Sequence, residues 1–314
     1  MFKKVILACF ILLFSLNGFS RTPIHKTGYF TGQLNDKIFY QYWQVENPKA
    51  ILVIAHGFGE YSDRYLEMAD HYTKLGLSVY ALDHRGHGRS EGDRWNVENF
   101  DYFLDDLHYY IGNIVKKLEG SDKKLILLGH SMGGEIAAKH ALVYPEDFDY
   151  LILSSPSVGT YLAGIPLPQF VTTMTGALGP IVSTINLIGN FPMPGTQIPA
   201  EYLSHDTSIV EAYANDPLVC HEAIKMRMSV ELSQNMSYIQ RNAGKSKNSP
   251  ILVMYGTEDR VVPPNSVVNY YNSLEIEDKT LKGFEGFYHE IFNEIGKEEV
   301  YRITDDWIMG RINQ

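Results

Sequence analysis

A small hydroxyl side chain stands where an apolar run breaks off. The stretch Lys124–Gly134 reads KLILLGHSMGG and places Ser131 between Gly129 and Gly133. Glycines on both sides let a strand turn sharply into a helix, because the side chains that would collide there are missing. A serine at such a turn stands beside a helix N-terminus, where the N–H of Met132 faces a developing negative charge. The pattern therefore predicts a nucleophilic serine with one oxyanion donor.

A serine hydroxyl needs a base before it attacks a carbonyl, and the base needs a carboxylate that orients it. In serine enzymes built on this turn, the acid follows the serine in the chain and the histidine follows the acid. Glu258 and Asp259 both follow the apolar run 251–255, and Asp259 is preferred because Gly-x-x-Asp places it in the turn past the strand. His289 is the only histidine after these acids. We therefore predict a triad of Ser131, Asp259 and His289.

A second oxyanion donor is expected in the loop after an early strand. The apolar run 51–55 is followed by HGFG, in which Gly57 allows close approach of the backbone and Phe58 supplies the N–H. His56 is expected to pack this loop rather than to carry a proton. The DHRGHG stretch at 83–88 is expected to be a rigid turn, and a metal cluster there is disfavoured because its glycines hold ligands poorly. No metal or cofactor is expected.

The composition is that of a folded, acidic protein. The chain has 314 residues, of which 45% are hydrophobic and 12% aromatic. This is enough to bury a full core as one large domain, with or without an insertion, and it argues against disorder. The formal net charge is −10. Because an acidic surface repels phosphate backbones, nucleic acid is not expected as a partner.

Short apolar runs alternate with stretches of helical periodicity. The runs cover residues 51–55, 78–82, 125–128, 150–153 and 251–255, and the helical stretches cover 65–75, 100–118 and 135–144. Continuous apolar runs fit strands buried on both faces, so we expect an α/β fold with a mostly parallel central sheet flanked by helices. Residues 28–45 alternate aromatic and polar side chains, which predicts an antiparallel hairpin at the sheet edge, turning at 34–36.

One segment interrupts this alternation. Residues 150–200 contain no Asp, Glu, Lys or Arg and include seven prolines. So many prolines are not expected in a membrane span, and the length exceeds one loop, so we predict an apolar cap insertion at about 156–225. It is expected to form an apolar channel and to contact lipid at its rim. Candidate channel residues are Phe170, Val171, Ile181, Leu187 and Phe191.

The first twenty residues resemble an export signal. Lys3 and Lys4 precede the apolar run 5–16, and small residues stand at 18 and 20. This pattern predicts a signal peptide at 1–20, a mature domain at 21–314 and a periplasmic or secreted protein. An uncleaved N-terminal anchor is the alternative. Cleavage leaves Cys220 as the only cysteine, so no internal disulfide is expected and the thiol is expected to be buried.

Together these motifs resemble the monoacylglycerol lipase and lysophospholipase branch of the α/β-hydrolases, from about residue 28 to the C-terminus. The resemblance implies the α/β-hydrolase fold, a mobile cap and hydrolysis of esters of one long acyl chain. It also implies Ser131, Asp259 and His289 as the triad, with Phe58 and Met132 as oxyanion donors. The matching pieces are HGFGEYSDRY at 56–65, DHRGHGRS at 83–90, GHSMGG at 129–134, NDPLV at 215–219, YGTED at 255–259 and YHE at 288–290.

Other functions remain open at this stage. Peptidases of the same fold need an acid in the cap for the substrate ammonium, and Glu201 and Asp206 could supply one. A hydrolase of other small esters with the same fold and a catalytically silent binding protein are further alternatives. The head group, whether glycerol or glycerophosphocholine, and the oligomeric state are not predicted.

Overall fold

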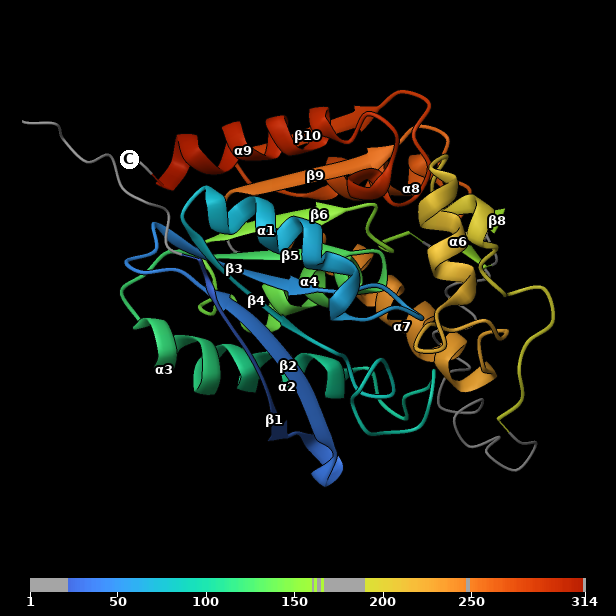
Figure 1. The fold of residues 1–314 in the computed structure, drawn as a ribbon. Coiled ribbons are helices and arrows are strands. Elements are labelled where there is room, and N and C mark those ends of the chain that lie inside the picture. Colours follow the sequence, from blue (N-terminus) through green and yellow to red (C-terminus); the bar gives the residue numbers. More distant parts are fainter. Residues whose placement is uncertain (1–21, 160, 163–164, 167–189, 247–248, 313–314) are drawn as a thin grey trace, which may run out of the picture.

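The computed structural model describes residues 22–159, 161–162, 165–166, 190–246 and 249–312. Its main element is an eight-stranded sheet in the order β1-β2-β4-β3-β5-β6-β9-β10 (Figure 1). These strands are β1 Ile24–Thr31, β2 Lys37–Gln44, β3 Ala50–Ala55, β4 Leu77–Leu82, β5 Leu125–His130, β6 Tyr150–Ser154, β9 Ile251–Gly256 and β10 Lys279–Phe284. A separate two-stranded pair consists of β7 Tyr161–Leu162 and β8 Ile165–Pro166.

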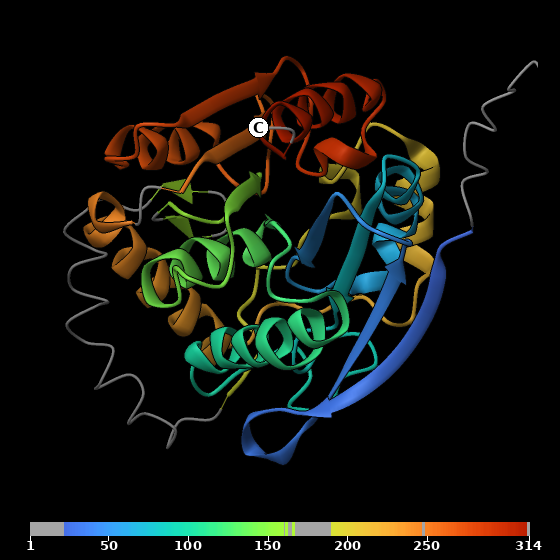
Figure 2. The same ribbon diagram turned by 90° about the vertical axis from the view of Figure 1, so that its left-hand side faces the viewer.

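Helices lie on both sides of the sheet (Figures 1 and 2). Their bounds are α1 Leu66–Lys74, α2 Asp101–Tyr110, α3 Lys116–Glu119, α4 Met132–Val143, α6 Thr207–Asn215, α7 Met226–Asn242, α8 Pro264–Ser273 and α9 Glu298–Ile312. Short 3₁₀ turns occur at Gln33–Asn35, Ser62–Tyr65, Ala200–Tyr202, Ala243–Lys245 and Ile291–Asn293.

The five predicted strands are confirmed, and their alternation builds two cores. Val53 of β3 pairs with Leu127 of β5, and both side chains belong to the core that also contains side chains of α2, α4 and α8. The next pair, Ile54 and Leu128, faces the opposite way, toward α1 and α9. Because both faces of these parallel strands are covered by helices, the strands read as unbroken apolar runs in the sequence.

The predicted edge hairpin is also confirmed. β1 and β2 pair antiparallel along their length, and β2 continues antiparallel onto β4. The turn uses Leu34 and Asn35 at φ values of 59° and 64°.

Three features differ from expectation. The helix predicted at 100–118 is α2 and α3 joined by a π-helical turn at Ile111–Val115. The helix predicted at 135–144 begins at Met132, because the serine turn leads directly into it. β10 was not predicted, since most of its side chains are only half-buried at the edge of the sheet and its apolar pattern is weak.

The described part of the predicted cap lies beyond the carboxyl ends of the parallel strands, where α6 and β8 appear in Figure 1. The limits of the cap remain a prediction. The predicted signal segment and four of the channel candidates, Phe170, Val171, Ile181 and Leu187, lie outside the described residues. Among the described residues, no helix combines the length and hydropathy needed to cross a bilayer.

Cys220 is buried, as expected, beside the loop that follows β3. Its backbone N–H donates to the Gly59 carbonyl oxygen at 2.8 Å. Burial raises the pKa of the thiol to about 11, so the sulfur is an unreactive packing group.

The close approach of α4 to β3 gives a first prediction. A Cβ atom at Gly133 would lie 2.0 Å from the carbonyl oxygen of Ala55. Gly133→Ala must therefore push backbone apart, and we expect it to lower the free energy of unfolding by about 3 kcal/mol or more. Gly310→Ala in α9 is the control, because nothing lies within 4 Å of its added Cβ. Urea unfolding should show the control unchanged or stabilised; equal stabilities for the two variants would contradict the packing described.

Candidate active site

Ser131 occupies a strained backbone turn between β5 and α4. Its φ of 51° and ψ of −117° are rare for a residue with a side chain. The turn is held by hydrogen bonds from the Ser131 N–H to the Ser154 carbonyl at 3.0 Å and from the Glu135 N–H to the Ser131 carbonyl at 3.0 Å. A Cβ at Gly129 would lie 2.3 Å from the Gly133 carbonyl oxygen, so the missing side chains are what the turn requires.

His289 and Asp259 form a buried pair. His289 Nδ1 lies 2.7 Å from Asp259 Oδ2, and the carboxylate can only accept, so Nδ1 carries the proton. Asp259 Oδ1 accepts from the N–H groups of Val261 and Val262, each at 2.8 Å. Of the two acids left open by the sequence, Glu258 is exposed, whereas Asp259 is buried against His289. Asp259 is therefore the acid that pairs with His289, and this hydrogen bond fixes the ring in the tautomer that carries its proton on Nδ1.

Ser131 and His289 line the same small pocket, together with Gly57, Phe58 and His130. His289 Nε2 is buried, and no described residue hydrogen-bonds to it. The pairing with Asp259 leaves a lone pair on this nitrogen. This nitrogen can take the serine proton once the Ser131 hydroxyl, which lines the same pocket, comes within hydrogen-bonding distance of it.

Two backbone N–H groups close to Ser131 have no acceptor among the described residues. Within the described residues, neither the Phe58 N–H nor the Met132 N–H donates to a protein acceptor. The preceding N–H, of Gly57, is instead taken by Glu60 Oε1 at 2.5 Å. A Cβ at Gly57 would lie 3.2 Å from the Cβ of Ser131, which shows how closely this loop approaches the serine.

A second, larger cavity of about 330 Å³ also has Ser131 in its wall. Most of its wall is apolar, and this part of the wall consists of Phe58, Met132, Ile198, Pro199, Tyr202, Ile224, Leu232, Met236, Val261 and Val262. Cavities of this size and character bind apolar ligands.

The charge at this cavity is positive. Among the described lining residues there is no Asp or Glu, and the charged one is Arg260, which stacks on the Tyr288 ring at 4.6 Å. The two acids considered for ammonium binding lie elsewhere: Glu201 is exposed, and Asp206 accepts from the Ser208 N–H at 2.9 Å as the N-cap of α6. The described wall therefore offers no site for a substrate ammonium.

One predicted channel residue is wrong. Phe191 is 41% exposed and does not line the cavity. Part of the wall comes from α7, which supplies Leu232 and Met236 and was not assigned from the sequence. The spacing of Met228, Leu232, Met236 and Ile239 is helical and could have revealed this face.

The glycine-rich turn after β4 is rigid, as predicted. Asp83 accepts from the Ser62 N–H at 2.9 Å and the Arg89 N–H at 2.8 Å, and Arg85 pairs with Asp106 and Asp36. His56 is buried and accepts from the His84 N–H at 2.8 Å, so it packs the loop.

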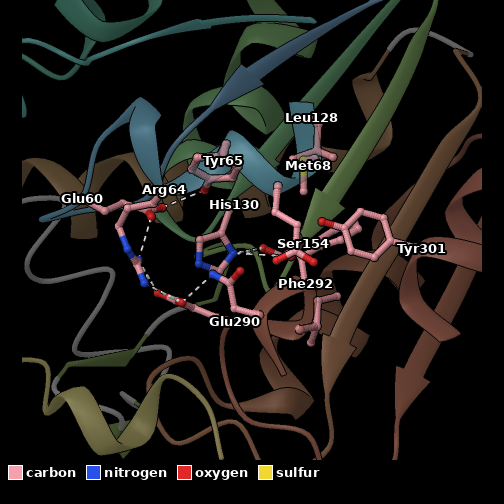
Figure 3. Close-up of a pocket in the computed structure, with 13 residues that line it drawn as sticks. Glu60, Arg64, Tyr65, Met68, Leu128, His130, Ser154, Glu290, Phe292 and Tyr301 are labelled. Atoms are coloured by element: carbon pink, nitrogen blue, oxygen red, sulfur yellow. Dashed lines mark hydrogen bonds and ion pairs between the residues drawn. The ribbon is translucent and has the colours of Figure 1, made fainter. Parts of the chain in front are cut away.

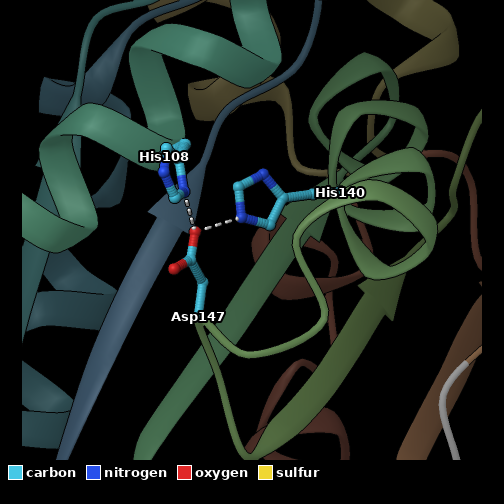
Figure 4. A group of neighbouring side chains, drawn as sticks. All are labelled: His108, His140 and Asp147. Carbon is cyan, nitrogen blue, oxygen red and sulfur yellow. Dashed lines mark hydrogen bonds and ion pairs between the residues drawn. The ribbon is translucent and has the colours of Figure 1, made fainter.

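One group of potential metal ligands occurs among the described residues, and it lies away from Ser131. His108, His140 and Asp147 bring their donor atoms within 4.8 Å of one another (Figure 4). Both rings donate to the same carboxylate oxygen, Asp147 Oδ2, at 2.7 Å and 2.9 Å, and Lys116 Nζ lies 3.6 Å from the other oxygen. These nitrogens already serve as hydrogen-bond donors, so we assign the cluster to the packing of α2 against α4.

Glu135 is a buried acid behind the cavity wall. It accepts a hydrogen bond from Asn235 Nδ2 at 2.9 Å and another from Ser157. Burial raises the pKa of this carboxyl well above its ordinary value of 4.5, and these two hydrogen bonds only partly oppose the effect. Glu135 therefore joins α4 to α7 as a neutral group.

This shift predicts how stability depends on pH. The folded protein retains the Glu135 proton where the unfolded chain has lost it, so this stabilising contribution is complete below pH 4.5 and is lost as the pH rises through the folded pKa. Glu135→Gln removes the dependence. We expect the variant and the native protein to have similar free energies of unfolding near pH 4.5. As the pH rises, the variant should become more stable than the native protein. Unfolding curves across pH, with the exposed Glu285→Gln as control, test this; parallel curves would refute it.

The comparisons with known proteins show the family to which this chain belongs. The family profile described as "Serine aminopeptidase, S33" matches residues 46–296. A monoacylglycerol lipase of Mycolicibacterium smegmatis is 32% identical over 287 residues, covering 90% of this chain and 96% of that protein. The monoglyceride lipase of Rattus norvegicus is 32% identical over 281 residues, covering 88% of each. The crystal structure of Paleococcus ferrophilus monoacylglycerol lipase matches with a TM-score of 0.69 and 26% identity, covering 91% of this chain and 99% of that one. The chain therefore belongs to the serine aminopeptidase S33 family of α/β-hydrolases, in its monoacylglycerol lipase branch, and is a serine ester hydrolase.

Proposed function

We propose that this protein hydrolyses esters of a single long acyl chain, monoacylglycerols first and lysophospholipids second. The observation that carries the proposal is the apolar cavity of about 330 Å³ whose wall includes Ser131. An acyl chain lying in it would place its ester carbonyl at the serine. The relatives named as monoacylglycerol lipases support the same substrate class.

In the proposed mechanism, His289 Nε2 takes the proton of the Ser131 hydroxyl while the serine oxygen attacks the ester carbonyl. The carbonyl oxygen becomes negative as the tetrahedral intermediate forms, and the N–H groups of Phe58 and Met132 receive it. Each such donor typically contributes about 10²–10³ in turnover. The imidazolium then gives its proton to the departing glycerol oxygen, and an acyl-enzyme remains.

Deacylation repeats these steps with water. His289 removes a proton from the water, the hydroxide attacks the acyl carbonyl, and the proton returns to the Ser131 oxygen as the fatty acid leaves. Asp259 keeps the ring in the required tautomer and stabilises its charged form. These steps draw only on groups of this chain and on water.

The electrostatics favour the charged ring in the transition state. Burial alone would lower the pKa of His289, but Asp259, Glu290 and Glu60 together hold it above its ordinary value. The resting ring must still be neutral, so activity is expected to rise as the pH increases through the pKa of His289.

The cavity wall gives the means of selecting the acyl chain. Each buried CH₂ contributes about 0.8 kcal/mol, which is about fourfold in affinity or rate. A substrate that fills the cavity with several more CH₂ groups than another is therefore strongly preferred.

We further propose that the protein is exported and meets its substrate at a membrane surface. The charged and apolar pattern of residues 1–20 supports export. The exposed Phe191, beside the start of α7, supports contact between the cap region and lipid.

An aminopeptidase activity is the second candidate, because the matching family carries that description. The cavity argues against it. A free N-terminal ammonium would meet Arg260 rather than a carboxylate at the described wall.

The test is a hydrolysis panel on the purified protein. It contains monoacylglycerols from butyryl to oleoyl, oleoyl lysophosphatidylcholine, triolein and alanine p-nitroanilide. We expect the oleoyl monoacylglycerol to be cleaved faster than the butyryl one and the anilide to remain intact. Ser131→Ala should lose about 10⁴–10⁶-fold in turnover.

The exposed Ser273→Ala, on the last turn of α8, is the matched control and should keep full activity. Turnover of Ser131→Ala at the native rate would end the proposed mechanism. A preference for the shortest acyl group, or for the anilide, would end the proposed substrate class.

A further inference from the structure

A buried ion network joins the two loops that flank Ser131. It consists of Glu60, Arg64 and Glu290, named here the clamp (Figure 3). The side chains of Glu60 and Glu290 are 5% exposed and that of Arg64 is 12% exposed. The mechanism above uses none of the three as a proton carrier, although the network lies beside His130.

One end of the clamp holds the oxyanion loop. Glu60 Oε1 accepts from the Gly57 N–H at 2.5 Å and from the Tyr65 hydroxyl at 2.7 Å, while its Oε2 accepts from Arg64 Nη1 at 2.9 Å. Glu60 thus holds the first peptide of Gly57, on the N-terminal side of the peptide that carries the Phe58 N–H. The carbonyl oxygen of that second peptide, Gly57 O, accepts from His56 Nδ1 at 2.8 Å, so Glu60 and His56 together orient the Phe58 donor.

The other end holds the histidine loop. Arg64 makes a bidentate contact with Glu290, from Nη1 at 2.5 Å and Nη2 at 2.8 Å. Glu290 directly follows His289, its N–H donates to the Leu203 carbonyl at 2.8 Å, and its carboxylate also accepts from Asn293. Such a planar, two-bond contact fixes direction as well as distance.

We propose that Arg64 is a positioning residue that sets the oxyanion donor Phe58 and the base His289 in register with Ser131, acting through Glu60 and Glu290. The proposal rests on the function proposed above. It follows from the contacts, because Arg64 is the group that binds both carboxylates, and each carboxylate anchors one of the two loops.

The charge of the clamp also matters for the base. Two carboxylates and one guanidinium leave a net charge of −1 near the imidazole. The ionisable groups around His289 are Asp259, Glu60 and Glu290, with Arg64 of opposite sign in the same pocket. The tilted ring of His130 lies 4.8 Å from the His289 ring, centroid to centroid. Burial keeps the pKa of His130 low, so this neighbour remains neutral.

A buried ion network of this kind is expected to add little to the free energy of unfolding. Removing two carboxylates and a guanidinium from water costs about as much as their attraction returns. Because deleting one partner would leave an unpaired buried charge, the experiment uses substitutions that keep size or charge.

The chain offers a matched control. Arg85 also bridges two carboxylates, Asp106 and Asp36, and its side chain is 3% exposed, but its partners anchor no loop of the active site. We compare Arg64→Lys with Arg85→Lys, which preserve charge and lose the planar contact. For p-nitrophenyl decanoate we expect Arg64→Lys to lower kcat about 10²-fold, the cost of a displacement near 1 Å, with KM changed less than twofold. Arg85→Lys should keep the native kcat.

A second pair of variants tests the charge. Glu290→Gln brings the clamp from −1 to neutral, so the pKa of His289 should fall and the acid limb of kcat/KM should move to lower pH. Asp106→Asn, the same change at the control site, should leave the acid limb in place. A merely structural role for Glu290 would lower activity without moving this limb.

The outcomes separate the proposals. Equal kcat values for Arg64→Lys and Arg85→Lys would overturn the proposed role of the clamp, and so would an acid limb that stays fixed in Glu290→Gln. If the wild-type protein is active in these experiments, the proposed function stands. If Arg64→Lys does not fold, the Glu290→Gln and Asp106→Asn profiles decide. An inactive wild type, or one equal to Ser131→Ala, would overturn the proposed function and the clamp with it.

Discussion

The structure depends on one steric constraint, the strained turn that carries Ser131 from β5 into α4. The turn exists because side chains are absent around it: a Cβ at Gly129 would lie 2.3 Å from the Gly133 carbonyl, and one at Gly133 would lie 2.0 Å from the Ala55 carbonyl. The strained turn places the Ser131 hydroxyl at the carboxyl edge of the sheet, and the Met132 N–H next to it donates to no described residue. β3, β5 and β9 are parallel, so the loops that follow them all begin at the same edge of the sheet. This places Phe58 and Asp259 at the same edge as Ser131.

The surroundings of Ser131 divide into an apolar and a polar half. On one side, α7 and the described cap residues wall a cavity without acids, which suits an acyl chain. The polar half contains the imidazole of His289 and three buried carboxylates. Asp259 accepts a hydrogen bond from its Nδ1, and Glu60 and Glu290 form ion pairs with Arg64. The apolar half can select a substrate by buried area alone, whereas the polar half must hold angles, and ion pairs with two bonds do this better than packing. We therefore regard the clamp as the polar counterpart of the turn at Ser131.

How much could be predicted follows from the range of each interaction. The five parallel strands, the hairpin and the Ser131 turn were predicted, because each depends on a local pattern of apolar residues or glycines. The pairing of Asp259 with His289 could be anticipated because chain order left few candidates. The clamp could not, since Arg64 and Glu290 lie 226 positions apart and nothing in either local sequence marks them as partners. The prediction that Phe191 lines the cavity was wrong because it relied on the uncharged segment. The apolar residues of α7 recur at helical spacing but are separated by polar residues, so this helix was not recognised as part of the wall.

The central claim is that Ser131 is an alcohol activated by His289, and labelling tests this most directly. The purified protein is treated with a long-chain alkyl fluorophosphonate, digested and mapped by mass spectrometry, at pH values on both sides of the acid limb. We predict a single adduct, on the peptide that contains Ser131, formed faster above the limb than below it. An adduct on another serine, or no adduct from a preparation that hydrolyses esters, would contradict the account.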